Sequence, residues 1–118
     1  MTDISPYLNR PDILSDTARQ VIKDFGMQGM EINFSGNTGN TYDELFSQIL
    51  PHIDKLLKAD PGKFYNLMYR IDISEVQIKK AVEQAADKSF SEVVTDLILK
   101  RELLKVVMRK NYSLGKER

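Results

Sequence analysis

Residues 89–111 read SFSEVVTDLILKRELLKVVMRKN and form the longest helical pattern in the chain. At 100° per residue, one apolar group covers an arc of about 180°: Phe90, Val93, Val94, Leu97, Ile98, Leu104, Val107 and Met108. A second apolar group occupies the far side: Leu99, Leu103 and Val106. Apolar side chains on nearly every side indicate either a helix at the centre of its own bundle or a stripe that meets a partner, most simply in a homodimer. The pattern favours the central helix and leaves the homodimer as the alternative.

Residues 41–58, TYDELFSQILPHIDKLLK, carry the clearest amphipathic pattern. Their apolar residues recur at helical spacing along one face. Thr41 and Glu44 fit the S/T-x-x-E capping box, which marks a helix start. Pro51 falls on the polar side, where a proline can bend a helix without breaking it. We therefore expect one kinked helix over 42–59, with two shorter helices as the alternative.

Three shorter helices are predicted around this pair, over 15–25, 61–71 and 75–87. Asp60-Pro61 supplies an N-cap and a first-turn proline. Two further capping boxes open the fourth and last helices: Ser74 with Gln77, and Ser89 with Glu92. The sequence thus predicts an all-α fold, a compact bundle of four to five helices.

Residues 26–40 interrupt the helical pattern. Four of the six glycines lie here: Gly26, Gly29, Gly36 and Gly39. Between them Met30, Ile32 and Phe34 alternate with polar residues, which is the period of a short strand. No second strand pattern follows, so the backbone of such a strand would have to pair with water, a loop or another molecule. The segment 30–34 is therefore a candidate for strand pairing across an interface.

The two ends of the chain differ from its middle. Pro6 and Pro11 predict that residues 1–14 form an extended arm. Residues 15–111 are expected to form a single helical domain, and 112–118 a flexible tail. A length of 118 residues suits one domain of this kind.

Composition excludes several classes of site. The chain has no cysteine and one histidine, which excludes a disulfide framework, a thiol nucleophile and any site built from two imidazoles of one chain. We expect no cofactor and no metal. Without a signal-like start or a long apolar run, the expected location is cytoplasmic, with no contact to a membrane.

The chain is neutral but polarised. Residues 97–118 hold seven basic and two acidic side chains, whereas residues 1–96 hold ten basic and fifteen acidic ones. Lys105, Arg109 and Lys110 are the candidate contacts to nucleic acid or to an acidic partner. The simpler interpretation is that cations near a helix C-terminus favour the helix dipole, by about 0.3–1 kcal/mol each.

The motifs tested for catalysis are weak. The loop 35–41 lacks the lysine of a phosphate-binding P-loop. His52 has the pattern of a surface histidine, and Asp72 and Glu75 flank a turn in which acidic residues are ordinary. A motif for DNA binding is equally weak: the helices 61–71 and 75–87 have helix-turn-helix spacing, but short helical hairpins have the same spacing. We therefore predict that the chain is not an enzyme.

Two further features point to contacts. Tyr65 and Tyr69 lie four residues apart, off the apolar stripe of their helix, and form either a contact patch or a pair that seals the core edge. Arg101 falls inside the stripe centred on Phe90. Its stem either lies along the core with the head in solvent, or its head pairs with one of three carboxylates: Asp72, Asp87 or Asp96.

These patterns together predict a non-enzymatic protein–protein interaction or regulatory domain that associates with itself. The candidate interface residues are Leu99, Leu103, Val106, Met30, Ile32, Phe34, Tyr65 and Tyr69. The alternative is a nucleic-acid-binding protein that uses the basic C-terminal helix.

Overall fold

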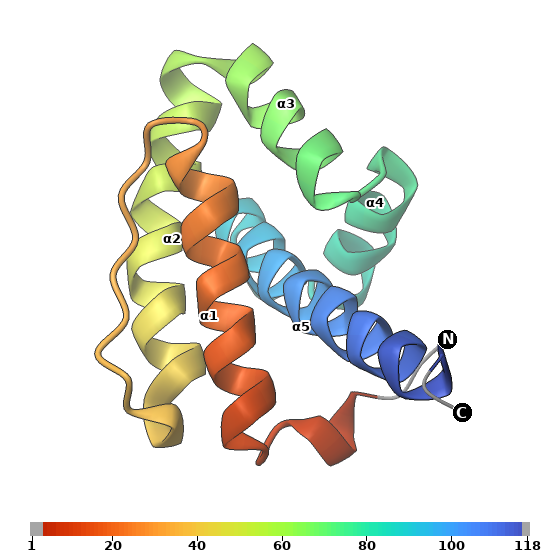
Figure 1. Cartoon of the computed structure of the whole chain (residues 1–118). Helices are drawn as coiled ribbons and strands as arrows, with labels where there is room; N and C mark the ends of the chain where they lie inside the picture. Colours follow the sequence, from red (N-terminus) through yellow and green to blue (C-terminus); the bar gives the residue numbers. More distant parts are fainter. Residues whose placement is uncertain (1–3, 117–118) are drawn as a thin grey trace.

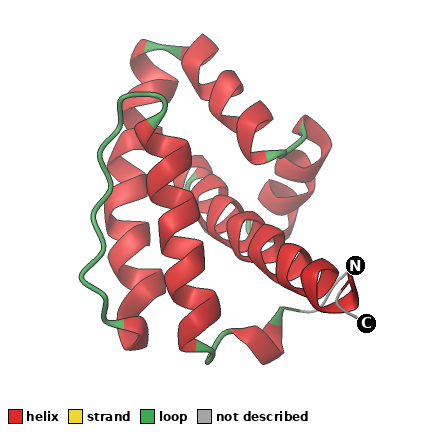
Figure 2. Cartoon of the chain, in the orientation of Figure 1, coloured by secondary structure: helices red, strands yellow, loops and turns green. Residues whose placement is uncertain are grey.

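The computed structural model describes the backbone of residues 4–116 and the side chains of residues 4–111 (Figure 1). Five α-helices and two short 3-10 helices follow one another, and Figure 2 shows no strand in this part of the chain. Their order is η1 (Ser5–Tyr7), α1 (Pro11–Gly26), η2 (Thr38–Asn40), α2 (Thr41–Ala59), α3 (Pro61–Ile71), α4 (Glu75–Gln84) and α5 (Phe90–Lys116). The predicted all-α bundle is confirmed.

Helix α5 is the central element. Helices α1 and α2 lie side by side, α3 leads away from the end of α2, and α4 returns the chain to α5 (Figure 1). Helix α5 contacts all four other α-helices. The main core joins α1, α2, α3 and α5 through apolar side chains such as Phe25, Ile49, Leu67 and Ile98. The central-helix prediction is therefore confirmed.

The two faces of α5 are not buried as the periodicity suggested. Leu99, Leu103 and Val106 are 5%, 4% and 1% exposed, so they form no free stripe for a homodimer. Ile13, Ile4 and Tyr7 from the N-terminal segment pack around Leu103 and Val106. Phe90 and Met108, from the predicted core stripe, are exposed instead. Because Val94, Ile98 and Val107 of the first group are buried as well, the chain covers both apolar groups and leaves single positions of the first one exposed.

Helix α1 begins earlier than expected. Pro11 is its first residue, so the predicted extended arm is wrong for 11–14. Proline is favoured there because its missing N–H would have no partner in the helix and its φ already suits a helix. The short 3-10 helix η1 precedes it, so the arm is not extended over Ser5–Tyr7 either.

Two other boundaries differ from the sequence expectations. Helix α4 ends at Gln84 rather than 87, whereas α5 continues past 111 to Lys116. The predicted flexible tail is therefore helical over 112–116, and residues 117–118 lie outside the described residues. Helix α2 is one helix with Pro51 inside it and exposed to solvent, as predicted.

The segment 30–34 is extended but forms no strand, and Figure 1 shows it running along α2. Gln48 of α2 accepts from the Asn33 N–H at 2.9 Å and donates to the Asn33 carbonyl at 2.7 Å. Met30 and Ile32 are 5% and 3% exposed, and Phe34 packs against the core. The premise for strand pairing across an interface, a backbone with no partner in its own chain, is wrong at Glu31 and Asn33, because side chains of α2 bond to both.

Two of the three predicted capping boxes form, and the third does not. Ser74–Gln77 and Ser89–Glu92 form the reciprocal hydrogen bonds that were predicted. Glu44 does not cap α2, because its carboxylate accepts from the N–H and hydroxyl of Ser35, each at 2.8 Å. The Glu44 of this S/T-x-x-E pattern therefore binds the preceding loop at Ser35 instead of capping the start of α2.

Candidate functional site

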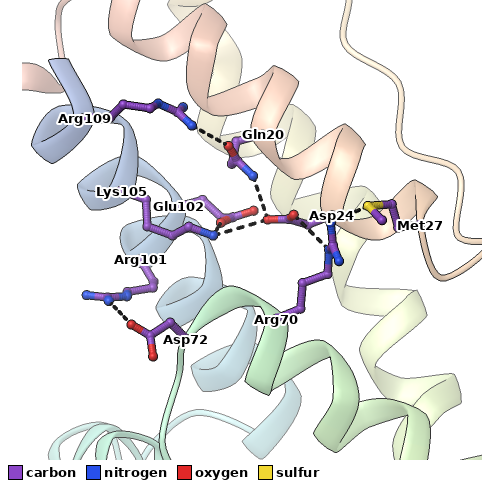
Figure 3. Close-up of polar contacts among 9 residues, drawn as sticks. All are labelled: Gln20, Asp24, Met27, Arg70, Asp72, Arg101, Glu102, Lys105 and Arg109. Atoms are coloured by element: carbon purple, nitrogen blue, oxygen red, sulfur yellow. Dashed lines mark hydrogen bonds and ion pairs between the residues drawn. The ribbon is translucent and has the colours of Figure 1, made fainter. Parts of the chain in front are cut away.

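Two carboxyl groups are buried between α1 and α5. Asp24 of α1 is 2% exposed and Glu102 of α5 is 0% exposed. Figure 3 shows both carboxyl groups turned toward each other. The Lys105 ammonium lies 3.1 Å from Glu102 Oε1 and 3.5 Å from Asp24 Oδ2. Arg70 of α3 donates from Nε to Asp24 Oδ1 at 3.1 Å. We call Asp24, Arg70, Glu102 and Lys105 the buried cluster.

The two acids of the buried cluster titrate in opposite directions. Burial raises the pKa of Glu102 to about 8, and the facing Asp24 carboxylate, which accepts a hydrogen bond only from the protonated form, adds to the rise. Burial also opposes ionisation of Asp24. Hydrogen bonds from Glu102 and Gln20, with the charges of Lys105 and Arg70, outweigh it and hold the pKa of Asp24 below its ordinary value. The pair therefore favours one proton, carried by Glu102.

The surroundings of the buried cluster fix its geometry. Gln20 donates to Asp24 Oδ2 at 3.1 Å and accepts from Arg109 at 3.2 Å. The guanidinium of Arg70 also contacts the sulfur of Met27. An open pocket of about 570 Å³ lies beside Arg70 and Asp24, between α1 and α3. Because Glu102 does not line this pocket, any ligand there would meet only the outer side of the buried cluster.

The cations proposed as a nucleic-acid surface have partners within the chain. Lys105 belongs to the buried cluster, and Arg109 binds Gln20. Lys110 pairs with Asp12 at 3.0 Å and Asp16 at 3.2 Å. Hydrogen bonds from Arg10 and Lys110 hold the pKa of Asp12 well below its usual range. Acidic groups of α1 thus match the charges of Lys105 and Lys110, while Arg109 meets a neutral amide, and this pairing disfavours the nucleic-acid alternative.

Of the two outcomes predicted for Arg101, the ion pair with a carboxylate is the one that the structure shows, although the pair is not buried. Its guanidinium reaches Asp72, the first of the three carboxylates considered, at 2.5 Å. Asp72 is in the left-handed conformation that ends α3, with φ 69°, and its side chain is 79% exposed. The ion pair therefore lies at the surface, while the Arg101 Nε is buried without a hydrogen-bond partner.

A second candidate site is an apolar groove between α3, α4 and the start of α5. Its volume is about 600 Å³, and we call it the α3–α4 groove. Phe64, Ile78 and Val82 are the more buried apolar residues along it, while Tyr65 and Phe90 are 55% and 44% exposed. Two carboxylates and one ammonium lie among the other lining residues: Glu75, Glu83 and Lys79.

The two predicted tyrosines are both exposed. Tyr69 is 89% exposed, which contradicts the expectation that Tyr65 and Tyr69 seal the core edge together. Tyr65 lines the α3–α4 groove, whereas Tyr69 lines the pocket between α1 and α3. The alternative interpretation, a contact patch, is the one that their exposure favours.

The remaining candidates have structural roles in the described part of the chain. His52 packs near the Phe25 ring and bonds to the Glu31 carbonyl. Asn37 caps the short helix η2 in the 35–41 loop. Residues 4–111 hold no group of three or more side chains suited to a metal ion.

Sequence reasoning missed Asp24, Arg70 and Glu102. Asp24 lies three residues after Val21 and Glu102 four after Ile98, both at core spacing. That spacing was the available signal, but charged residues are almost never buried unless they are paired. Their partners are far apart in sequence, so the pairing was not visible.

Comparison with known proteins assigns no relationship. No family model, curated protein or solved structure matches this chain. In the described residues, no helix is long and apolar enough to cross a membrane. A functional assignment therefore rests on the chemistry of its own surfaces.

Proposed function

We propose that the chain is a non-enzymatic protein–protein interaction domain, and that its α3–α4 groove receives an amphipathic helix of a partner protein. The observation that carries this proposal is the exposure of Tyr65 and Phe90 beside an apolar groove. Exposed aromatic side chains at the edge of an apolar depression are typical of binding surfaces. Helix-in-groove binding uses such a surface.

The dimensions and charges of the groove define the partner. Helix α4 has ten residues and is therefore about 15 Å long, which matches about three turns of a partner helix. Such a helix would place apolar anchors at positions i, i+4 and i+7 against Ile78 and Val82. Because Glu75 and Glu83 outnumber Lys79 among the lining residues, we expect basic residues beside the anchors.

Self-association loses part of its original basis. It was expected from Leu99, Leu103 and Val106, from the segment 30–34, or from Tyr65 and Tyr69. The chain itself largely covers the first two sets and leaves the two tyrosines exposed. A second copy seated in the α3–α4 groove is therefore one outcome of the test below. The cytoplasmic location and the lack of catalytic activity stay predictions from composition.

The test uses two synthetic helical peptides with the same apolar anchors, one flanked by lysine and one by glutamate. Binding to the full chain is followed by NMR chemical shifts and quantified by calorimetry. We expect the lysine peptide to shift the amides of α3 and α4 and to bind more tightly than the glutamate peptide. Tyr65→Ala is expected to weaken binding at least about tenfold, as loss of an aromatic anchor does.

Met108→Ala is the matched control. Met108 is 52% exposed and lies eighteen residues along α5 from Phe90, which is about 27 Å in a helix. This variant should bind like the original chain. The proposal would be refuted if neither peptide binds, or if the chemical shift changes centre on residues outside α3 and α4. A dimer in light scattering that Tyr65→Ala dissociates would replace the partner helix with a second copy.

A further inference from the structure

The buried cluster holds an arrangement that an ordinary surface ion pair does not have. Glu102 Oε2 is buried and makes no hydrogen bond in the described structure. The same carboxyl group faces Asp24 across the contact between α1 and α5 (Figure 3). A proton on Oε2 would let Glu102 donate to the Asp24 carboxylate. Protonation therefore supplies the missing partner, because a carboxylate can only accept.

The charges around the two acids come from three helices. Asp24 belongs to α1, Arg70 to α3, and Glu102 and Lys105 to α5. Arg101 of α5 is directed away to Asp72, and Arg109 to Gln20. Among the described residues, no ionisable side chain of α2 or α4 pairs with the buried cluster.

When Asp24 and Glu102 are both ionised, the single ammonium of Lys105 cannot form a full ion pair with each of them. Lys105 is 3.1 Å from Glu102 and 3.5 Å from Asp24. Arg70 contacts the other oxygen of Asp24, and among the described side chains no arginine forms an ion pair with Glu102. With both acids ionised, two buried negative charges would face each other across the α1–α5 contact, which is unfavourable at low dielectric.

We infer that Glu102 and Asp24 share one proton, and that its release to water loosens the contact between α1 and α5, so that the buried cluster acts as a proton-operated clamp. With the proton in place, the Glu102 hydroxyl donates to Asp24 and joins the two helices. When it leaves, the repulsion between the carboxylates draws water into the contact. Arg70 transmits the change to α3, because it shares Asp24 with Lys105.

The first test is a titration of the unaltered protein. The side-chain carboxyl carbons of the glutamates are followed by ¹³C NMR as the pH is raised. We expect the Glu102 resonance to change with a midpoint near pH 8, after the exposed glutamates have finished titrating. A midpoint in the ordinary range of glutamate, close to 4.5, would overturn the shared proton.

The second test measures the clamp itself. Hydrogen exchange of the amides in the second half of α1 is compared at about pH 6 and about pH 9, after correction for the intrinsic exchange rate. We expect protection to fall at the higher pH in the original chain. In Glu102→Gln it should stay constant, because the glutamine amide donates to Asp24 at every pH. Glu31→Gln, which alters an exposed glutamate, is the matched control and should behave like the original chain.

A third variant separates the two acids. In Asp24→Asn the facing negative charge is removed, so the midpoint of Glu102 should fall although its burial persists. The clamp would be refuted if Glu102 of the original chain titrates near pH 8 but the α1 amides keep the same protection from hydrogen exchange at both pH values. An unchanged Glu102 midpoint in Asp24→Asn would refute the sharing of the proton.

Discussion

Replacing Glu102 with glutamine should abolish most of the dependence of folding stability on pH between about 5 and 8. In the folded chain the pKa of Glu102 is raised from 4.5 to about 8 by burial and by the facing Asp24 carboxylate. Between these two values the folded state binds one proton more than the unfolded state. The free energy of unfolding must therefore fall as the pH rises.

The size of this fall follows from the two pKa values. Each pH unit in this window lowers the free energy of unfolding by about 1.4 kcal/mol. Over the whole interval the loss is about 5 kcal/mol, and between pH 5.5 and 7.5 it is about 3 kcal/mol. Domains are commonly stable by only ~5–15 kcal/mol, so the effect is large.

Asp24 contributes in a different range. The pKa of Asp24 is lowered in the folded chain, so its stabilising contribution is present above the ordinary value of 3.8 and is lost as the pH falls below that value. Together the two acids predict greatest stability from this pair at about pH 4, between the ordinary values of the two side chains, 3.8 and 4.5.

The assay is urea unfolding followed by far-ultraviolet circular dichroism at about pH 5.5 and about pH 7.5, below the folded pKa of Glu102. The original chain should lose stability over this interval more steeply than Glu102→Gln. The difference between the two cancels every ionisable group that they share, including the single histidine. Glu31→Gln should follow the original chain. If Glu102→Gln and the original chain lose the same stability within about 0.5 kcal/mol, the reasoning from burial is wrong.

Three further changes test the fold with unfolding or exchange measurements. Leu103→Ala should lower the free energy of unfolding by about 2–5 kcal/mol, because it opens a cavity at a 4% exposed position; Met108→Ala at an exposed position of the same helix should have less than about 0.5 kcal/mol of effect. Ser74→Ala should lower it by about 0.5–2 kcal/mol, since it removes the hydroxyl that caps α4. Gln48→Ala should speed hydrogen exchange at Asn33, whose N–H and carbonyl it holds, with little change in global stability.

The helices were predictable because their signals are local. Periodic apolar residues and caps such as Ser74 lie within one or two turns of each other, so a short window contains the information. The start of α1 at Pro11 was missed because the fixed φ of proline is compatible both with an extended arm and with the first turn of a helix. The segment 30–34 was a candidate strand because alternation is also what a loop shows when every second side chain is buried.

The contacts between helices were less predictable. Periodicity showed that α5 is apolar on two sides, but not that residues 4–13 would cover Leu103 while Met108 stayed exposed. The reason is that burial of a helix face depends on segments about 90 residues away in the chain. The charge pattern failed in the same way. Lys110 looked available for a partner until the fold placed it against Asp12 and Asp16 of α1.

The buried cluster also fixes how three helices sit relative to one another. An apolar contact tolerates sliding, because dispersion contacts are not directional. The Asp24 carboxylate can meet both Lys105 and Arg70 at only one register of α1 against α5 and α3. Burying these charges is rarely the most stabilising choice, since packed apolar residues of similar volume often do as well or better. The cluster therefore adds directional contacts that tie α1 to α3 and α5, which non-directional apolar packing does not supply.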